Sequence, residues 1–144
     1  MNAQPTETRE VRTMRDIAAG LALILSLAAP GLGVAQTASP ATPRERFDRA
    51  DKNHDGKLDR EEFYQLAVES FYFRDKEKKG YLTVDQLPET SPEAFKAANR
   101  KHDGRLTLEE YVNALFLDFE RADTNKDGTL SLEEIEAYRR ANPR

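Results

Sequence analysis

The sequence predicts an all-α fold made of four helix–loop–helix units, arranged in two halves of 48 residues with long shared helices. The first observation behind this prediction is a twelve-residue segment, rich in side-chain oxygens, that recurs four times at intervals of 24 residues. The second is that each copy has glycine at its sixth position and leucine two residues later. The third is that apolar residues flank every copy, and regular repetition of this kind indicates a repeated structural unit. The segments, called the first to the fourth loop, are residues 51–62, 75–86, 99–110 and 123–134.

The first loop reads DKNHDGKLDREE and places oxygen-bearing side chains at alternate positions. This order fits the pattern D-x-[DN]-x-[DN]-G-x5-E at every required position. Ca²⁺ takes 6–8 oxygens at about 2.3–2.6 Å, and Gly56 allows the sharp turn that wraps such a loop around the ion. The alternative is a single solvated acidic turn ahead of a helix, and the recurrence of the loop argues against it. The candidate ligands are Asp51, Asn53, Asp55, Asp59 and Glu62, with the backbone carbonyl of Lys57.

The fourth loop, DTNKDGTLSLEE, offers a similar set of oxygens, whereas the second loop does not. The candidate ligands of the fourth loop are Asp123, Asn125, Asp127 and Glu134, with the backbone carbonyl of Thr129 and with Ser131 acting through a water. The second loop keeps Asp75 and Glu77 but has Lys79 where an acceptor belongs, and it ends in the neutral amide Gln86. Because an ammonium group repels a divalent cation, we expect the second loop to be empty.

The third loop is intermediate between these cases. It keeps Asp103 and Glu110, but Asn99 opens it and Lys101 replaces its second ligand. We expect calcium binding there to be weak or absent. The sequence therefore predicts two tight Ca²⁺ sites, in the first and fourth loops.

Together the four loops resemble the EF-hand family of calcium-binding proteins, in a bacterial secreted or periplasmic type with a 24-residue repeat. The resemblance covers essentially all of the chain after residue 43. It implies calcium as the bound ion and short bridges between paired loops. It also implies that degenerate loops serve as structural partners of working ones.

Two long helices follow from the spacing of the loops. Only twelve residues, with no Gly or Pro, separate Glu62 from Asp75, so one helix from Asp59 to Phe73 must leave the first loop and enter the second. The segment Tyr111 to Phe119 has the same place between the third and fourth loops. A helix of about fifteen residues is roughly 22 Å long, so loops at its opposite ends cannot pair with each other. We predict instead that the first loop pairs with the third and the second with the fourth, through Leu58–Leu106 and Leu82–Leu130.

Prolines mark the shorter helices. The first helix is expected to start near Thr42, with Pro43 at its first position, and to run to about Ala50. Between the second and third loops, Pro88 and Pro92 end one helix near Leu87 and begin another that Ser91 caps. In the predicted pairing, the first and fourth loops, which have complete ligand sets, would each pair with a degenerate loop.

The N-terminal region is predicted to be a secretory signal. Residues 17–35 are apolar or small, Arg15 precedes them, and small residues before Gln36 fit a cleavage site. Met14 begins a conventional signal start, which makes it an alternative start of the protein. The alternative is a membrane anchor, because nineteen residues nearly span a bilayer. The expected division is a signal peptide at 1–35, a flexible linker at 36–43 and an EF-hand domain at 44–144, with the mature protein in the periplasm or the medium and free of the membrane.

Composition excludes several other functions. The 26 acidic residues barely exceed the 22 basic ones, so the charge does not favour nucleic-acid binding, and the chain has no cysteine for a disulfide or a thiolate site. His54 and His102 fall at the fourth loop position, which points outward, and are expected to be exposed filler. No nucleophile with its base and no phosphate loop is found, so we expect no enzyme.

Three roles remain open for a calcium-binding chain of this kind. The first is a calcium buffer or calcium-stabilised structural module. The second is a sensor that exposes an apolar surface to an extracytoplasmic protein partner. The third is a dockerin-like docking module, against which four loops and an N-terminal capping helix argue.

Overall fold

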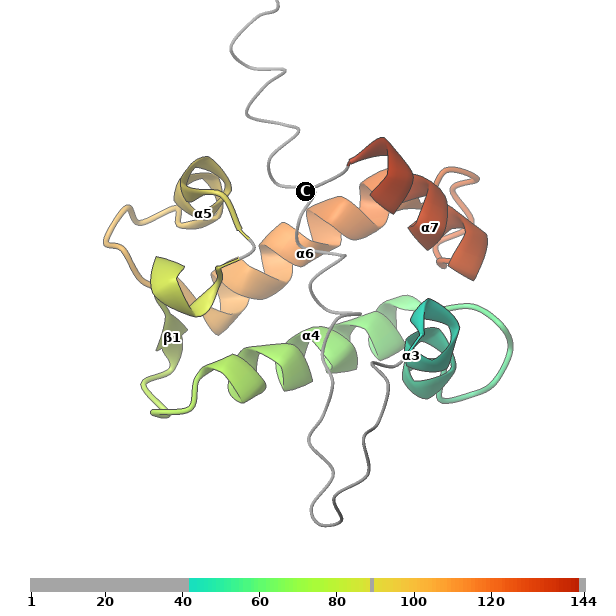
Figure 1. Cartoon of the computed structure of the whole chain (residues 1–144), viewed down its shortest axis with the longest axis horizontal. Coiled ribbons are helices and arrows are strands. Elements are labelled where there is room, and N and C mark those ends of the chain that lie inside the picture. Colours follow the sequence, from blue (N-terminus) through green and yellow to red (C-terminus); the bar gives the residue numbers. More distant parts are fainter. Residues whose placement is uncertain (1–41, 89, 143–144) are drawn as a thin grey trace, which may run out of the picture.

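A computed structural model describes residues 42–88 and 90–142 of the 144-residue chain (Figure 1). The predicted signal peptide and nearly all of the predicted linker lie outside these residues. The described part is mostly helical, and it also contains a two-stranded antiparallel sheet, so the all-α prediction is incomplete. In chain order the elements are α3 (Pro43–Ala50), α4 (Arg60–Arg74), β1 (Tyr81–Leu82), the 3-10 helix η1 (Val84–Gln86), α5 (Pro92–Ala98), β2 (Leu106–Thr107), α6 (Leu108–Ala122) and α7 (Leu132–Ala141).

The helices begin where the sequence predicts, because each has a residue that accepts its free N–H groups. Thr42 caps α3, with Pro43 at the first position, and Ser91 caps α5 ahead of Pro92. In α4, α6 and α7 the cap is the ninth residue of a loop, and it forms a capping box with the glutamate at the twelfth position. The same glutamates are the candidate metal ligands, so loop closure and helix initiation share one side chain.

The helices α4 and α6 lie side by side and run in opposite directions (Figure 1). The ring of Phe63, near the start of α4, lies 4.9 Å from the ring of Phe119, near the end of α6. Towards the other end, the Phe71 ring lies 5.7 Å from that of Tyr111, near the start of α6. These rings are at most 3 % exposed, so the core of the molecule lies between the two long helices.

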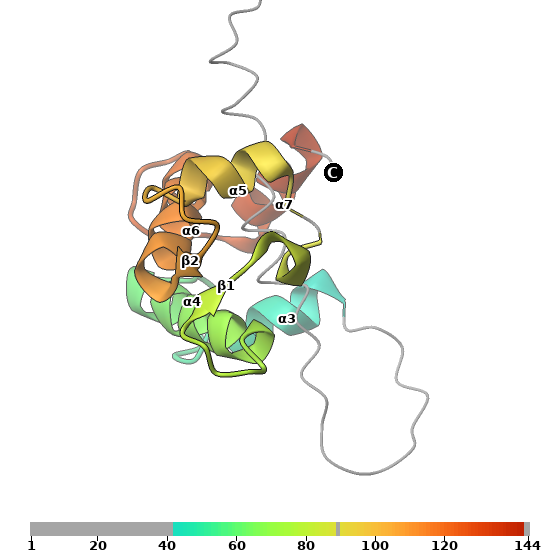
Figure 2. The ribbon, with the colours of Figure 1, turned by 90° about the vertical axis from the view of Figure 1, so that its left-hand side faces the viewer.

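This antiparallel packing decides which loops pair, and it overturns the predicted pairing. The backbone of Leu58 in the first loop bridges that of Leu130 in the fourth, and β1 of the second loop pairs with β2 of the third in the register Leu82–Leu106 (Figure 2). The prediction that the first and second loops do not pair is confirmed. The partners chosen for them, the third and the fourth loop respectively, are wrong.

The chain between the second and third loops explains the error. η1 ends the second loop, and the connection after it contains only the seven-residue helix α5, which is about 10 Å long, whereas α4 spans roughly 22 Å. The chain therefore stays at one end of α4, where the third loop meets the second, and α6 returns to bring the fourth loop to the first. Each pair joins the two halves, so the halves are not separate units. Within the described residues, no helix is both long and apolar enough to cross a membrane.

Candidate metal centre

All four loops share one backbone conformation. The residue at the fourth position has a positive φ in each loop, and the glycine at the sixth position does as well. The fourth position therefore has His54 at φ 59° and His102 at φ 52°, a left-handed conformation that is uncommon for residues other than glycine. Both histidines are exposed, as expected, and they take no part in the loop interior.

In the first loop, the acidic side chains already organise the backbone. The buried carboxylate of Asp51 accepts hydrogen bonds from the amides of Asp55, at 3.2 Å, and Gly56, at 2.9 Å. Glu62 reaches back from α4, where its Oε1 accepts from the amides of Lys52 and Asn53 and its Oε2 accepts from that of Asp59. The loop is thus wrapped around a ring of acceptor oxygens.

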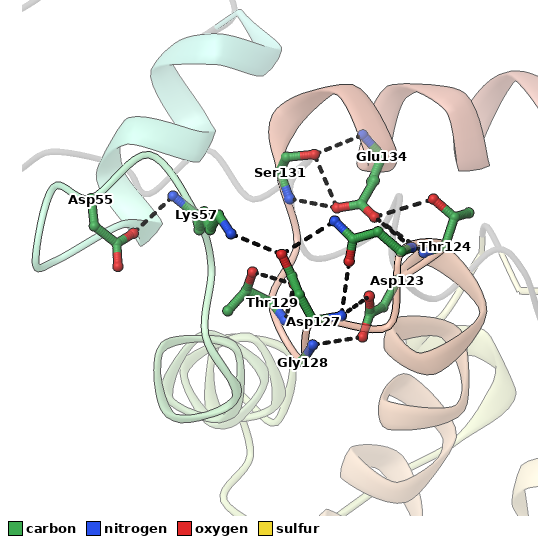
Figure 3. A network of polar contacts seen from close by, with 10 residues as sticks. Asp55, Lys57, Asp123, Thr124, Asp127, Gly128, Thr129, Ser131 and Glu134 are labelled. Carbon is green, nitrogen blue, oxygen red and sulfur yellow. Dashed lines mark hydrogen bonds and ion pairs between the residues drawn. The ribbon is translucent and has the colours of Figure 1, made fainter.

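The fourth loop repeats this arrangement with additional side-chain donors (Figure 3). Asp123 accepts from the amides of Asp127 and Gly128. Glu134 accepts from the hydroxyl and amide of Ser131 through Oε2 and from those of Thr124 through Oε1. Burial acts to raise the pKa of Glu134, but the hydrogen bonds from Ser131, Asn125 and Thr124 together hold the pKa below its usual value. The carboxylate is therefore charged at neutral pH.

The first and fourth loops, the two with complete sets of candidate ligands, are joined at their centres. Leu58 donates its amide hydrogen to the carbonyl of Leu130 at 2.8 Å, and Leu130 donates to Leu58 at 2.9 Å. The side chain of Lys57 extends from the first loop to Asp127 of the fourth, with Nζ 2.8 Å from Oδ2 (Figure 3). This hydrogen bond is the main reason that the pKa of Asp127 lies well below its usual value. The sequence predicts a role only for the backbone carbonyl of Lys57, as a ligand of the first loop. The contact of its side chain with Asp127 could not be predicted, because it depends on the pairing of the loops.

The second loop is closed without a metal ion. Lys79, at the fifth position, forms an ion pair with Glu77 at the third position. Gln86, at the twelfth position, accepts from the amide of Thr83 and donates its own amide hydrogen to the carbonyl of Arg74 at 3.2 Å. The ammonium group of Lys79 therefore pairs with the carboxylate of Glu77, a candidate ligand. Gln86 donates a hydrogen bond to the Arg74 carbonyl, which a carboxylate could not do.

The third loop keeps part of a metal-binding set. Glu110 accepts from the amides of Lys101 and Thr107, and Asp103 accepts from that of Arg105. Asn99 is 3 % exposed, and its Oδ1 is a buried acceptor that has no hydrogen-bond partner within the described part of the chain. The corresponding aspartates of the other loops accept two amide hydrogens each. Asn99 therefore differs from these aspartates in leaving the acceptor at the first ligand position without a hydrogen bond.

The donor chemistry of the first and fourth loops fits Ca²⁺, which prefers carboxylate, amide and carbonyl oxygens. Their carboxylates are engaged with the amides of the loops, and among residues 42–88 and 90–142 no three Asp, Glu, His or Cys side chains converge as a ready-made metal cluster. The ligand oxygens would therefore have to exchange some amide contacts for the ion. When bound, calcium would supply the positive charge that these clustered acids lack.

Comparison with known families gives two matches. The family model described as EF hand matches residues 44–67 and again residues 118–137. The two matches support an EF-hand family. The first segment holds the first loop with α3 and the start of α4, and the second holds the fourth loop with the end of α6 and the start of α7. The two matched segments are those whose loops pair through Leu58 and Leu130 and whose candidate ligands are all oxygen atoms. A comparison of the chain with curated proteins found no match.

Proposed function

We propose that this protein binds two Ca²⁺ ions tightly, in the first and fourth loops, and acts as a calcium buffer or calcium-stabilised structural module. One observation carries the proposal. The two loops with complete sets of oxygen ligands, which are far apart in the sequence, lie side by side and share the Leu58–Leu130 bridge. EF-hand matches on the same two segments support calcium as the ion.

We propose that the remaining loops serve mainly as structure. The Lys79–Glu77 ion pair and the Gln86–Arg74 hydrogen bond close the second loop without metal. The third loop takes calcium at most weakly, because Lys101 stands at its second ligand position although Asn99 offers a free acceptor. The four hands would then form a calcium-dependent pair at one end of α4 and α6 and a metal-free pair at the other.

A structural role for calcium follows from the negative charge of the first and fourth loops when no ion is bound. Closely spaced carboxylates repel one another, and a bound divalent cation removes that repulsion. At a free calcium concentration of 100 times the dissociation constant, each site would stabilise the folded state by about 2.7 kcal/mol. The proposed role requires no catalysis by the protein.

A calcium sensor is the second candidate, and three exposed aromatic rings along α4 favour it. Tyr64 and Tyr72 are 48 % and 60 % exposed, and Phe73 is 39 % exposed. Such rings could contact an extracytoplasmic protein partner. Against it, the sequence has only Met1 and Met14, both in the predicted signal, so adaptable methionines of the kind that line promiscuous grooves are lacking in the mature chain.

We further propose that the protein acts outside the cytoplasm, in a periplasm or the medium. The support is the sequence of residues 17–35, with small residues before Gln36, which has the layout of a cleaved signal. Calcium modules in extracellular settings commonly bind in the range of about 10⁻⁴–10⁻³ M.

Calorimetric titration of the purified protein with Ca²⁺ tests the proposal. We expect two tight sites, with Glu62→Gln and Glu134→Gln each removing one, since the amide cannot supply a bidentate carboxylate. Glu110→Gln, the same change in the third loop, is the matched control and should leave both tight sites. Four equivalent sites, or a tight site that survives the double substitution of Glu62 and Glu134, would contradict the assignment.

A further inference from the structure

Lys57 contributes to the first loop through its backbone carbonyl and to the fourth loop through its side-chain ammonium group. Its carbonyl is the seventh-position ligand candidate of the first loop, whereas its ammonium group lies 2.8 Å from the carboxylate of Asp127 in the fourth loop. The hydrogen bond and charge of Asp127 and, less strongly, the charges of Asp55 and Glu134 raise the pKa of Lys57, so the charged ammonium form is favoured. The corresponding residue of the fourth loop, Thr129, has no charge and donates its hydroxyl to Asp127 within its own loop.

This contact could act on calcium binding in two opposing ways. If Lys57 positions Asp127 for the ion, its removal should weaken binding. If its positive charge opposes the arriving cation, its removal should tighten binding. The contacts of Asp127 decide between these effects.

Asp127 is held in place by several groups other than Lys57. Its Oδ1 accepts from the amide of Thr129 at 2.9 Å and from the Thr129 hydroxyl, and its Oδ2 accepts from the side-chain amide of Asn125 at 3.2 Å. Its own amide donates to Asp123 and to Asn125. Because these contacts remain when Lys57 is removed, the loss of positioning is small and the loss of positive charge dominates.

We propose that Lys57 is a built-in counter-cation that stabilises the first and fourth loops when no calcium is bound and lowers the calcium affinity of the fourth loop. The inference rests on the proposed calcium binding. In the metal-free state the ammonium partly neutralises acids that would otherwise repel one another across the Leu58–Leu130 bridge. When calcium binds at the fourth loop, the same ammonium would be a like charge in contact with Asp127, one of the candidate ligands of the ion.

The test replaces Lys57 with methionine, which keeps the length of the stem and removes the charge. The full-length coding sequence is expressed, and the purified protein is titrated with Ca²⁺ in chelator buffers and followed by the amide signals of Gly56 and Gly128. These two amides donate to Asp51 and Asp123, so each reports on one loop. Because an exposed charge pair is worth little, we expect the midpoint at Gly128 to move to roughly two- to fivefold lower calcium in Lys57→Met. The midpoint at Gly56 should move less, and the melting temperature of the metal-free protein should fall.

Two control variants separate this contact from general charge effects. Lys57→Arg keeps the positive charge and should leave the Gly128 midpoint near that of the wild type. Lys52→Met removes the same charge from another exposed position of the first loop and should shift the Gly128 midpoint less than Lys57→Met does. The difference between Lys57→Met and the wild type should shrink in high salt, which screens exposed charges.

Several outcomes would overturn the inference. If the Gly128 midpoint in Lys57→Met stayed unchanged or moved to higher calcium, the ammonium group would not oppose binding of the ion. Equal tightening by Lys52→Met would assign the effect to net charge alone. If the wild-type signals of Gly56 and Gly128 did not respond to calcium at all, the proposed function itself would fail, which is a result distinct from the other two.

Discussion

The hydroxyl oxygens of Ser70 and Tyr111 lie 2.9 Å apart in the buried interface between α4 and α6. Ser70 is fully buried and Tyr111 is 3 % exposed, so the two groups satisfy each other where water does not reach. The contact joins the later part of α4 to the start of α6. It therefore fixes the register of the antiparallel helices on which the pairing of the loops depends.

Replacing Tyr111 with phenylalanine should lower the free energy of unfolding by about 1–3 kcal/mol, because the Ser70 hydroxyl is then left buried without its partner. The ring remains, so packing against Phe71 is kept. Urea unfolding of the metal-free protein measures the change. Ser70→Ala and the double variant complete a mutant cycle, and strictly additive losses would show that the two hydroxyls do not interact.

Removal of the candidate calcium ligand Glu62 should also weaken calcium binding by the fourth loop. The first loop donates to and accepts from Leu130 through Leu58, so a disordered first loop withdraws two backbone hydrogen bonds from its neighbour. We expect Glu62→Gln to raise the calcium midpoint at Gly128 by about fivefold or more, a typical coupling between sites. Glu110→Gln, in a loop that pairs elsewhere, is the control. An unchanged Gly128 midpoint in Glu62→Gln would mean that the bridge does not couple the loops.

Tyr138 should make the protein sensitive to alkaline pH. Burial, together with the charge of Asp118, which accepts its hydroxyl at 2.9 Å, raises the pKa of Tyr138 above its ordinary value of 10.0. Since the folded-state pKa is the higher one, this contribution to stability is complete below pH 10 and is lost as the pH rises beyond it. Unfolding free energies measured across that range should fall more steeply for the wild type than for Tyr138→Phe.

The same variant should be less stable at neutral pH by about 1–3 kcal/mol, because Asp118 is fully buried and loses a hydrogen-bond donor. Tyr72→Phe is the matched control, since Tyr72 is 60 % exposed, and it should change neither value. An alkaline slope in Tyr138→Phe equal to that of the wild type would assign the sensitivity to other groups.

Calcium should raise the melting temperature and the helix content while the fluorescence of the dye ANS stays level or falls. The reason is that α4 and α6 each connect two loops, so a helix held at both ends has little freedom to swing open. Thermal unfolding by circular dichroism and ANS titration measure the two effects. A clear rise in ANS binding when calcium is added to folded, metal-free protein would favour the sensor.

Expression with the native N-terminus in a bacterium should yield an exported protein that begins at Gln36. The small residues ahead of Gln36 fit the specificity of signal cleavage. Intact mass and N-terminal sequencing of the periplasmic fraction decide the matter. A membrane-bound protein that keeps residues 17–35 would support the anchor instead.

Local chemistry was readable from the sequence. The caps at Thr42 and Ser91 and the breaks at Pro88 and Pro92 depend on residues within one turn of each other, and the single helix between the first and second loops depends on one short stretch without Gly or Pro. The expectation that the second loop is empty also rests on residues of one loop, Lys79 and Gln86, whereas the ion pair of Lys79 with Glu77 was seen only in the structure. The two-stranded sheet escaped the fold-class prediction because it consists of two-residue strands that form only where loops meet.

The pairing of the loops was decided by tertiary structure. The length of α4 excludes a pair between the first and second loops, but it allows either direction for α6. The antiparallel direction follows from the short chain through α5 and from buried contacts such as Ser70–Tyr111, which join residues 41 positions apart. The ligands of each loop are therefore set by the sequence of that loop, whereas the approach of Lys57 to Asp127 exists only because the long helices bring the two loops together.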